Sequence, residues 1–254
     1  MSTDVLQAPL TWLEANDPLP SVENAWGAGS DAPGLLAAGA DLGVDRLLEA
    51  YSKGVFPWFN ASQPVLWWSP DPRMVLKIAD FKLHRSLRKT LTRYASHPQF
   101  ELCFDRSFNQ VIEACSQSPR EGQNGTWIVP SMVAAYKALH QAGHAHSVET
   151  WLDGQLVAGL YFVCIGKAVF GESMFSTLTD GSKMALAALV QVCKRHDITA
   201  IDCQQKTAHL ASMGAQEMSR SAFLDVIGSA RHCASPDWKN AAIDWDQWRN
   251  ANIA

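Results

Sequence analysis

The sequence predicts an α+β protein, in which a small N-terminal part precedes a larger domain built on one sheet. Three strand-like stretches follow one another over residues 145–175, and the hairpin signal Asp153-Gly154 joins the first two. A helical pattern over 180–195 and a short apolar strand over 199–203 come directly after them. Hairpins join antiparallel neighbours and helical crossovers join parallel ones, so these elements predict one mixed sheet with helices packed on it.

The N-terminal part, residues 1–80, is expected to be a small α+β domain rich in aromatic loops. A short helix is predicted near 44–51, because Leu47 and Tyr51 share one helical face there. Tryptophans at positions 58, 67 and 68 then lie among three prolines, and proline disfavours a long strand. These rings form either a small aromatic core or a platform on which a flat ligand ring can stack.

The C-terminal domain is expected to span 81–254, with its boundary between residues 80 and 100. A chain of 254 residues with 47% hydrophobic side chains can fill one large core or two small ones. Besides the elements above, periodicity and turn signals predict strands at 74–78 and 100–104 and helices at 83–94, 107–117, 131–141, 206–213 and 221–232.

Composition limits the location and partners of the protein. Basic and acidic residues number 21 and 25, so any site for a polyanion must be local. The first twenty residues do not resemble a signal peptide, and no apolar run nears the roughly 20 residues of a membrane span. Six cysteines form no CxxC pair, and His144 and His146 stand outside any HExxH or Cys/His cluster. We therefore expect a cytoplasmic, monomeric protein with reduced thiols and no metal site.

A basic stretch interrupts this otherwise acidic chain. Six Lys or Arg side chains lie between residues 77 and 93, against one acid. Arg85, Arg88 and Lys89 share an exposed face of the helix predicted at 83–94. Such a face is either an ordinary solvated surface or a contact for a phosphate backbone.

Polar side chains end two neighbouring strands of the predicted sheet. Glu172 follows the apolar stretch 160–170, and Asp202 and Gln204 end the next strand. Residues two apart on a strand share a face, so Asp202 and Gln204 should point together. Cys203 should point to the opposite face, which argues against its use as a nucleophile. Because open sheets build sites at their strand ends, we expect Glu172, Asp202 and Gln204 in one cleft.

An antiparallel meander followed by strand, helix, strand and helix is the order of GNAT-type acyltransferases, whose sheet splays between two central strands to admit the acyl donor. Enzymes of this type that use acetyl-CoA hold its pyrophosphate with a glycine-rich loop at a helix N-terminus. The corresponding stretch here, 176–182, has one glycine and an aspartate. Coenzyme A is therefore not the expected donor.

Many short segments, in order along the chain, form a specific pattern. They include GVFPWF at 54–59, LWWSPDPR at 66–73, GTWI at 125–128, AHSVE at 145–149, GESMFS at 171–176, IDCQ at 201–204 and HLASMGA at 209–215. Over nearly its whole length the chain thus resembles the bacterial leucyl/phenylalanyl-tRNA–protein transferases. The resemblance implies transfer of Leu or Phe, with Met left open, from aminoacyl-tRNA to proteins that begin with Arg or Lys, which marks them for N-end-rule degradation.

The resemblance also implies roles for the polar residues at the strand ends. Gln204 would orient the acceptor amine and guide its proton, and Asp202 would hold and polarise Gln204. Glu172 would suit the cationic end of the acceptor, or would make a structural ion pair only. An aminoacyl ester is already activated, so the reaction needs no nucleophilic side chain, metal or cofactor.

Further binding residues follow from the same resemblance. The adenosine side would be formed by Trp58, Trp127 and Tyr136. The aminoacyl pocket would be lined by Val169, Met174 and Phe175. The tRNA backbone would be contacted by Arg85, Arg88 and Lys89.

Two other functional classes stay open. One is an amino-group acetyltransferase that uses acetyl-CoA, which the missing glycine-rich loop disfavours. The other is a non-catalytic RNA-binding module, which would need the basic face and the aromatic rings but not the polar residues at the strand ends.

Overall fold

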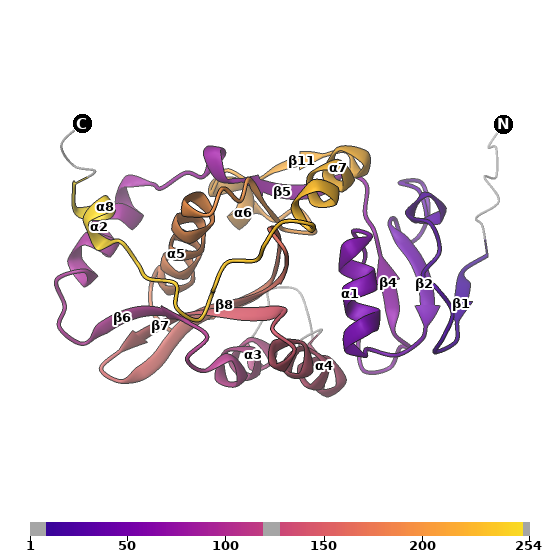
Figure 1. Ribbon diagram of the computed structural model, residues 1–254, viewed down its shortest axis with the longest axis horizontal. Helices are drawn as coiled ribbons and strands as arrows, with labels where there is room; N and C mark the ends of the chain where they lie inside the picture. The colour runs from indigo at the N-terminus through magenta and orange to yellow at the C-terminus, as the bar shows by residue number, and fades with distance from the viewer. Residues whose placement is uncertain (1–8, 119–127, 251–254) are drawn as a thin grey trace.

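The computed structural model describes residues 9–118 and 128–250. Within these ranges the chain forms a small N-terminal sheet and a larger C-terminal sheet with helices packed around them (Figure 1). The predicted α+β class is therefore confirmed.

The small sheet has the strand order β1-β2-β4-β3. Its strands are β1 (Thr11–Leu13), β2 (Leu35–Gly39), β3 (Phe56–Pro57) and β4 (Leu66–Trp68), preceded at β2 by the 3-10 turn η1 (Val22–Asn24). Helix α1 (Val44–Ser52) lies beside it, and Leu47 and Tyr51 are fully buried, as the helical pattern predicted. Trp67 is also fully buried, and its indole N–H donates to the carbonyl of Gly39 at 3.0 Å. This tryptophan therefore belongs to the core.

The larger sheet has the order β11-β5-β10-β9-β8-β7-β6. Its strands are β5 (Arg73–Lys77), β6 (Phe100–Phe104), β7 (Ala145–Leu152), β8 (Gln155–Ile165), β9 (Ala168–Ser176), β10 (Ala200–Asp202) and β11 (Gln216–Met218). The meander β7-β8-β9 is confirmed, and the pattern analysis missed β11. All pairs in this sheet are antiparallel except β9 with β10.

Helices cover both faces of the larger sheet. They are α2 (Arg85–Tyr94), α3 (Phe108–Gln117), α4 (Pro130–Gln141), α5 (Gly181–Arg195), α6 (Ala208–Ser212), α7 (Arg220–Ala230) and α8 (Trp245–Asn250), with the 3-10 turn η2 (Ile78–Asp80) after β5. Helix α5 lies on one face, and α3 and α4 lie on the other (Figure 1). Alternate residues of β8 accordingly enter different cores: Leu160 and Phe162 pack with α5, whereas Tyr161 and Val163 pack with α3 and α4.

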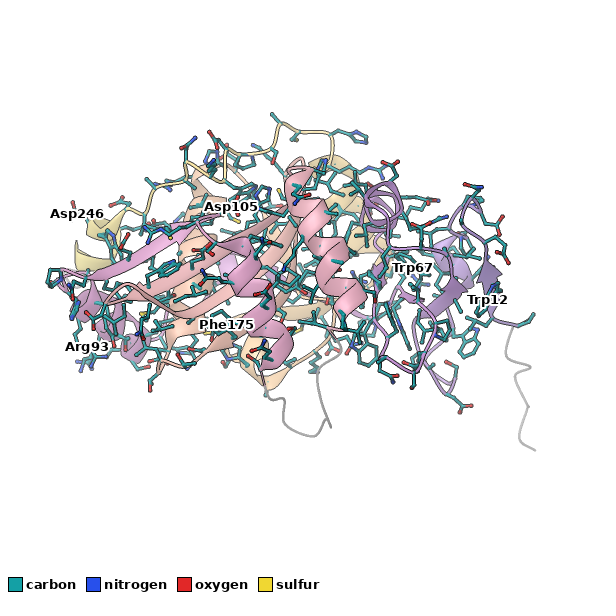
Figure 2. All side chains as sticks on the ribbon, turned by 90° about the horizontal axis from the view of Figure 1, so that it is seen from below. Trp12, Trp67, Arg93, Asp105, Phe175 and Asp246 are labelled. Carbon is teal, nitrogen blue, oxygen red and sulfur yellow. The ribbon has the colours of Figure 1, made fainter. Side chains whose placement is uncertain are left out.

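The two sheets pack against each other through a shared core. Trp67 of the small sheet and Phe175 of the larger one both belong to it, and Figure 2 labels both side chains. Strand β5 precedes the expected domain boundary at residue 80, yet it pairs within the larger sheet. We therefore propose that the boundary lies between Trp68, which ends β4, and Arg73, which begins β5.

The larger sheet opens between β9 and β10. Only two residue pairs join these strands, Ile201 with Val169 and Asp202 with Phe170. Strand β9 continues to Ser176 against β8 alone. This opening is the splay that the order of the elements predicted, and it leaves room at the sheet centre.

Across the described ranges, no helix combines the length and the apolar character that a membrane crossing requires.

Candidate active site

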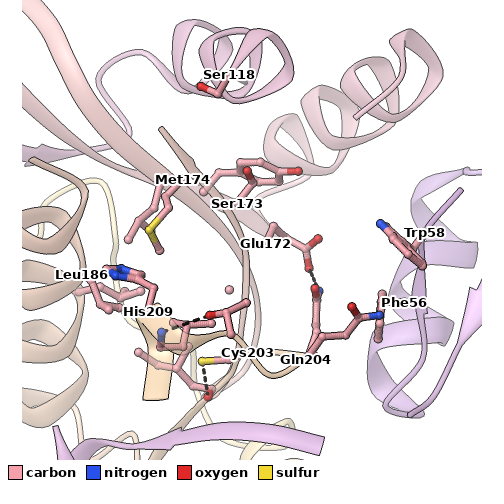
Figure 3. A pocket seen from close by; sticks show the side chains of 18 residues that line it. Phe56, Trp58, Ser118, Glu172, Ser173, Met174, Leu186, Cys203, Gln204 and His209 are labelled. Atoms are coloured by element: carbon pink, nitrogen blue, oxygen red, sulfur yellow. Dashed lines mark hydrogen bonds between the residues drawn. The ribbon is translucent and has the colours of Figure 1, made fainter. Parts of the chain in front are cut away.

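A cavity of about 440 Å³ occupies the opening between β9 and β10. Phe56 and Trp58 from the small domain lie at one end, and Met174, Leu186 and His209 lie at the other (Figure 3). Glu172 and Gln204 lie between the two ends. The wall is completed by Ser118, Leu160, Tyr161, Gly171, Ser173, Leu189, Ile201, Cys203, Gln205, Thr207 and Leu210.

Glu172 reaches the cavity from a β-bulge. Phe162 of β8 pairs with Gly171 and Tyr161 pairs with Ser173, so Glu172 is the extra residue of β9. Bulges bend a strand and redirect a side chain, and they are common next to active sites. The Glu172 carboxyl accepts hydrogen bonds from the Gln204 amide (Nε2 to Oε1, 2.8 Å) and from the Tyr51 hydroxyl (Oη to Oε1, 2.7 Å).

The hydroxyls of Tyr51 and Tyr136 form a closed hydrogen-bonded ring with this carboxyl. Tyr51 and Tyr136 are fully buried, their hydroxyls are hydrogen-bonded to each other, and Tyr136 Oη lies 3.2 Å from Glu172 Oε2. Burial and the charge of Glu172 raise the pKa of both tyrosines, which therefore remain protonated. The two hydroxyls and the Glu172 carboxyl make three oxygen–oxygen contacts, but the hydroxyls carry only two protons. A proton on Glu172 supplies the third hydrogen bond.

The pKa of Glu172 fits this proton count. Burial raises it to about 7; the charge of Asp202 raises it too, whereas the tyrosine hydrogen bonds and Arg73 lower it. Glu172 therefore exists in both protonation states near neutral pH.

Asp202 lies behind the cavity and is paired with Arg73. Both side chains are buried, and the guanidinium binds the carboxylate with two hydrogen bonds, Nε to Oδ1 at 2.8 Å and Nη2 to Oδ2 at 2.6 Å. Asp202 Oδ1 also accepts the backbone N–H of Gln204 at 2.8 Å. Gln204 there adopts a left-handed conformation with φ of 60°.

This geometry corrects two expectations about the strand end. Strand β10 ends at Asp202, so period-two alternation does not extend to Gln204. Cys203 consequently lines the cavity together with Gln204 instead of pointing away. Asp202 was expected to hold the Gln204 side chain, but it accepts the backbone N–H of Gln204 instead. The Gln204 side chain donates to Glu172. Burial, with the charge of Asp202, raises the pKa of Cys203 to about 12, and a thiol so protonated is a poor nucleophile.

The residues predicted for the adenosine and aminoacyl pockets are only partly brought together. Trp58 and Met174 line the cavity, whereas Tyr136 lies buried behind Glu172. Val169 and Phe175 are buried and do not line it. They lie in opposite cores because the bulge at Glu172 reverses the alternation between them. Trp127 lies outside the described residues.

The basic helix begins close to the cavity wall. Arg85 and Lys89 are exposed and Arg88 is half-buried. His84, just before α2, contacts the carbonyl of Ser212 through Nε2 at 2.7 Å. Ser212 ends α6, the helix that carries the cavity residue His209.

Several residues of the site had no signal in the sequence. Tyr51, Phe56, Arg73 and His209 lie far from Glu172 along the chain and form no motif with it. His209 is half-buried, its Nε2 has no partner within the described part of the chain, and burial together with Lys183 lowers its pKa. Only the match of their segments to a known pattern could have pointed to them.

One group of potential metal ligands lies elsewhere. Asp105, His140 and His146 offer atoms within 4.8 Å of one another and line a different cavity, of about 340 Å³. His146 Nδ1 lies 2.7 Å from Asp105 Oδ2, and His140 Nδ1 lies 2.7 Å from the carbonyl of Ala145. These contacts account for one nitrogen of each ring, and the expectation that the protein uses no metal stays a prediction.

Comparison with known proteins gives consistent results. The family model described as "Leucyl/phenylalanyl-tRNA protein transferase" matches residues 75–228, and the model of the N-terminal domain of the same proteins matches residues 40–71. The leucyl/phenylalanyl-tRNA–protein transferase of Polaromonas sp. is 56% identical over 242 residues, covering 95% of each chain. That of Albidiferax ferrireducens is 53% identical over 239 residues, covering 94% of each chain.

Similarity to solved structures is weaker. FemX matches with a TM-score of 0.43 and 11% identity over 69% of this chain and 66% of its own. L-PGS from Bacillus licheniformis matches with a TM-score of 0.35 and 10% identity over 69% of this chain and 57% of its own. The family models and the curated relatives, which cover the chain almost completely, establish that it belongs to the leucyl/phenylalanyl-tRNA–protein transferase family.

Proposed function

We propose that this chain transfers leucine or phenylalanine from aminoacyl-tRNA to the α-amino group of proteins that begin with Arg or Lys. One observation carries the proposal beyond family membership. The cavity has an amide–carboxyl pair, Gln204 with Glu172, between an aromatic end at Trp58 and an apolar end at Met174 and Leu186. Each end suits one part of an aminoacyl-adenosine.

The reaction exchanges an ester for a peptide bond. The neutral acceptor amine attacks the ester carbonyl carbon, the C–N bond forms through a tetrahedral oxyanion, and the C–O bond to the ribose breaks. The amine proton ends on the ribose oxygen. An α-amino group has a pKa of roughly 7.7–8.0, so a useful fraction is neutral at pH 7, and the site must mainly orient it.

Gln204 is the group that we assign to orient the amine. Its Nε2 donates to Glu172, so its Oε1 is the atom that can accept a hydrogen bond from the amine. A neutral amide is a very poor base, and the role of Gln204 is therefore alignment. Asp202 supports it from behind through the backbone amide.

Glu172 is the group that we assign to the cationic end of the acceptor. With a pKa of about 7 it is partly ionised at neutral pH, and its ionised form attracts an ammonium or guanidinium group. Tyr51 and Tyr136 keep the carboxyl oriented toward Gln204.

The donor side uses the two ends of the cavity. Met174, Leu186 and Leu189 provide an apolar surface for a Leu or Phe side chain, and unbranched methionine adapts to both shapes. Trp58 offers a ring for the terminal adenine. The basic face of α2 starts beside α6 and suits the backbone of the acceptor stem.

The direct test is transfer of labelled leucine from Leu-tRNA to a peptide that begins with Arg, compared with the same peptide acetylated at its N-terminus. We expect product with the free peptide only, and Gln204→Ala should reduce turnover roughly 10²-fold because the amine loses its alignment. A parallel reaction with acetyl-CoA as donor should give no product. Bound tRNA without transfer would overturn the proposal in favour of an RNA-binding module.

A further inference from the structure

A buried ion pair lies directly behind the proposed site. Arg73 is the first residue of β5 and Asp202 is the last residue of β10, and the side chain of each is at most 1% exposed. Burying two charges is unfavourable before their attraction offsets the loss of water, and an apolar pair of similar volume is often at least as stable. The stability of the fold is therefore a weak explanation for this pair.

The surroundings fix the guanidinium in one position. Nε and Nη2 bind Asp202, and Nη1 donates to the carbonyl of Gly54 at 3.2 Å. The rings of Phe56 and Phe223 lie over it, with centroids 4.7 Å and 4.6 Å from Cζ. A planar fork with two fixed hydrogen bonds orients a carboxylate in a way that a lysine ammonium cannot.

The oriented Asp202 carboxylate in turn fixes the backbone of Gln204. Its Oδ1 accepts both Arg73 Nε and the Gln204 backbone N–H, each at 2.8 Å. The left-handed conformation is unfavourable for a non-glycine residue, so a specific contact must hold Gln204 at its φ of 60°. In this conformation the Gln204 side chain reaches Glu172.

We propose that Arg73 is a positioning residue: it orients Asp202, which holds the turn at Gln204 and so aims the Gln204 amide at Glu172 and the acceptor amine. The inference rests on the proposed transfer reaction. It makes Asp202 a positioning residue as well, because neither Arg73 nor Asp202 lines the cavity.

The charge of the pair also acts on Glu172. The groups that face this carboxyl are Tyr51 from α1, Tyr136 from α4, Gln204, and the Arg73–Asp202 pair. Asp202 raises the pKa of Glu172, and Arg73 opposes this with a smaller effect that lowers it. Loss of Arg73 alone removes a positive charge that lowers the pKa of Glu172, so the acid limb of the pH–rate profile should move to higher pH.

The test compares Arg73→Lys, Arg73→Met and the double variant Arg73→Met/Asp202→Asn in the full chain. We expect kcat to fall at least tenfold in Arg73→Lys and roughly 10²-fold in Arg73→Met, with KM for aminoacyl-tRNA within twofold of wild type. The acid limb should move to higher pH in Arg73→Met and return toward the wild-type position in the double variant, which leaves no unpaired buried charge.

Arg46 provides a matched control. It is 8% exposed, pairs with Glu49 at 2.7 Å, and lies outside the site. Arg46→Met should lower the unfolding temperature without moving kcat or the pH profile. If the Arg73 variants behave like Arg46→Met, losing stability alone, the role of Arg73 is only structural and the inference is overturned.

Failure of the proposed function can be told apart from failure of this inference, because wild type itself would then give no transfer. In that case the inference is judged on the titration of the Glu172 carboxyl, followed by ¹³C NMR in wild type and in Arg73→Met. A higher apparent pKa in the variant supports it, and an unchanged pKa overturns it.

Discussion

At the scale of single residues, Glu172 carries a carboxyl whose burial disfavours its ionised form. A carboxyl that is half-buried at a bulge keeps its proton up to a pH near 7, because burial disfavours its charge. The same position gives it three neutral hydrogen-bond partners in Tyr51, Tyr136 and Gln204. Glu172 is thereby ready to change protonation state in the pH range where the acceptor amine begins to lose its own proton.

Glu172→Gln should stabilise the protein at high pH. Between about 4.5 and about 7 the unfolded chain releases a proton that the folded protein keeps, so wild-type stability falls as pH rises through this range. Glutamine carries no charge, and the variant should gain on the order of 1–3 kcal/mol at pH 8 and much less at pH 5. Thermal unfolding of the variant and of wild type at both pH values checks this. An equal difference in stability at pH 5 and pH 8 would contradict the raised pKa. Transfer should decrease in the same variant.

At the scale of elements, strand β9 and helix α2 carry the two kinds of group that we propose to be functional, the Glu172 carboxyl and the basic side chains. The bulge of β9 directs Glu172 into the cavity and sends Val169 and Phe175 into opposite cores. Helix α2 buries Leu87 and Leu91 and leaves its basic face toward solvent. Its start is fixed near the cavity by the contact between His84 and Ser212.

The double variant Arg85→Ala/Lys89→Ala should weaken tRNA binding without altering the chemistry. Each phosphate contact that is lost should make the slope of log affinity against log salt less steep by about 1, and affinity should fall roughly tenfold near physiological salt. Binding of Leu-tRNA at several salt concentrations measures both effects. Lys239→Ala, an exposed lysine on the C-terminal segment, serves as control and should change neither. An unchanged slope in the double variant would place the tRNA backbone elsewhere.

At the scale of the whole molecule, the site exists only where the small sheet packs against the larger one. Tyr51 and Phe56 come from the small N-terminal part, and Glu172 and Gln204 come from the larger sheet. Arg73 joins the two, since it binds Asp202 on one side and the carbonyl of Gly54 on the other. The packing of the two parts and the alignment of the site therefore depend on the same contacts.

Gly54→Ala should disturb this junction. Gly54 has a φ of 71°, and an added Cβ would lie 2.7 Å from the Leu224 side chain and 3.0 Å from Phe223, whose ring covers Arg73. We expect a loss of about 2–4 kcal/mol in unfolding free energy together with reduced transfer. Gly143→Ala is the control: its φ is 82°, but the new Cβ would meet nothing within 4 Å. It should lose only about 1–2 kcal/mol in unfolding free energy and keep full transfer. Equal effects of the two substitutions would contradict a special role for the contacts around Gly54.

The sequence by itself determined the fold class, the meander over 145–175, helices α1 to α7 but not α8, and the strand end at Asp202. These features follow from local patterns, because hydrophobic periodicity and turn chemistry act over a few residues. The segment pattern also pointed to the family that the comparisons establish.

Only the tertiary structure decided how the site is assembled. The bulge at Glu172 depends on pairing with β8, and it places this residue within β9 instead of at the strand end that the sequence predicted. The turn at Gln204 depends on a hydrogen bond to Asp202, so period-two reasoning failed there. Tyr51 and Arg73 join the site across separations of 121 and 129 residues. Contacts at such distances depend on how whole elements pack, and no local pattern in a single sequence encodes them.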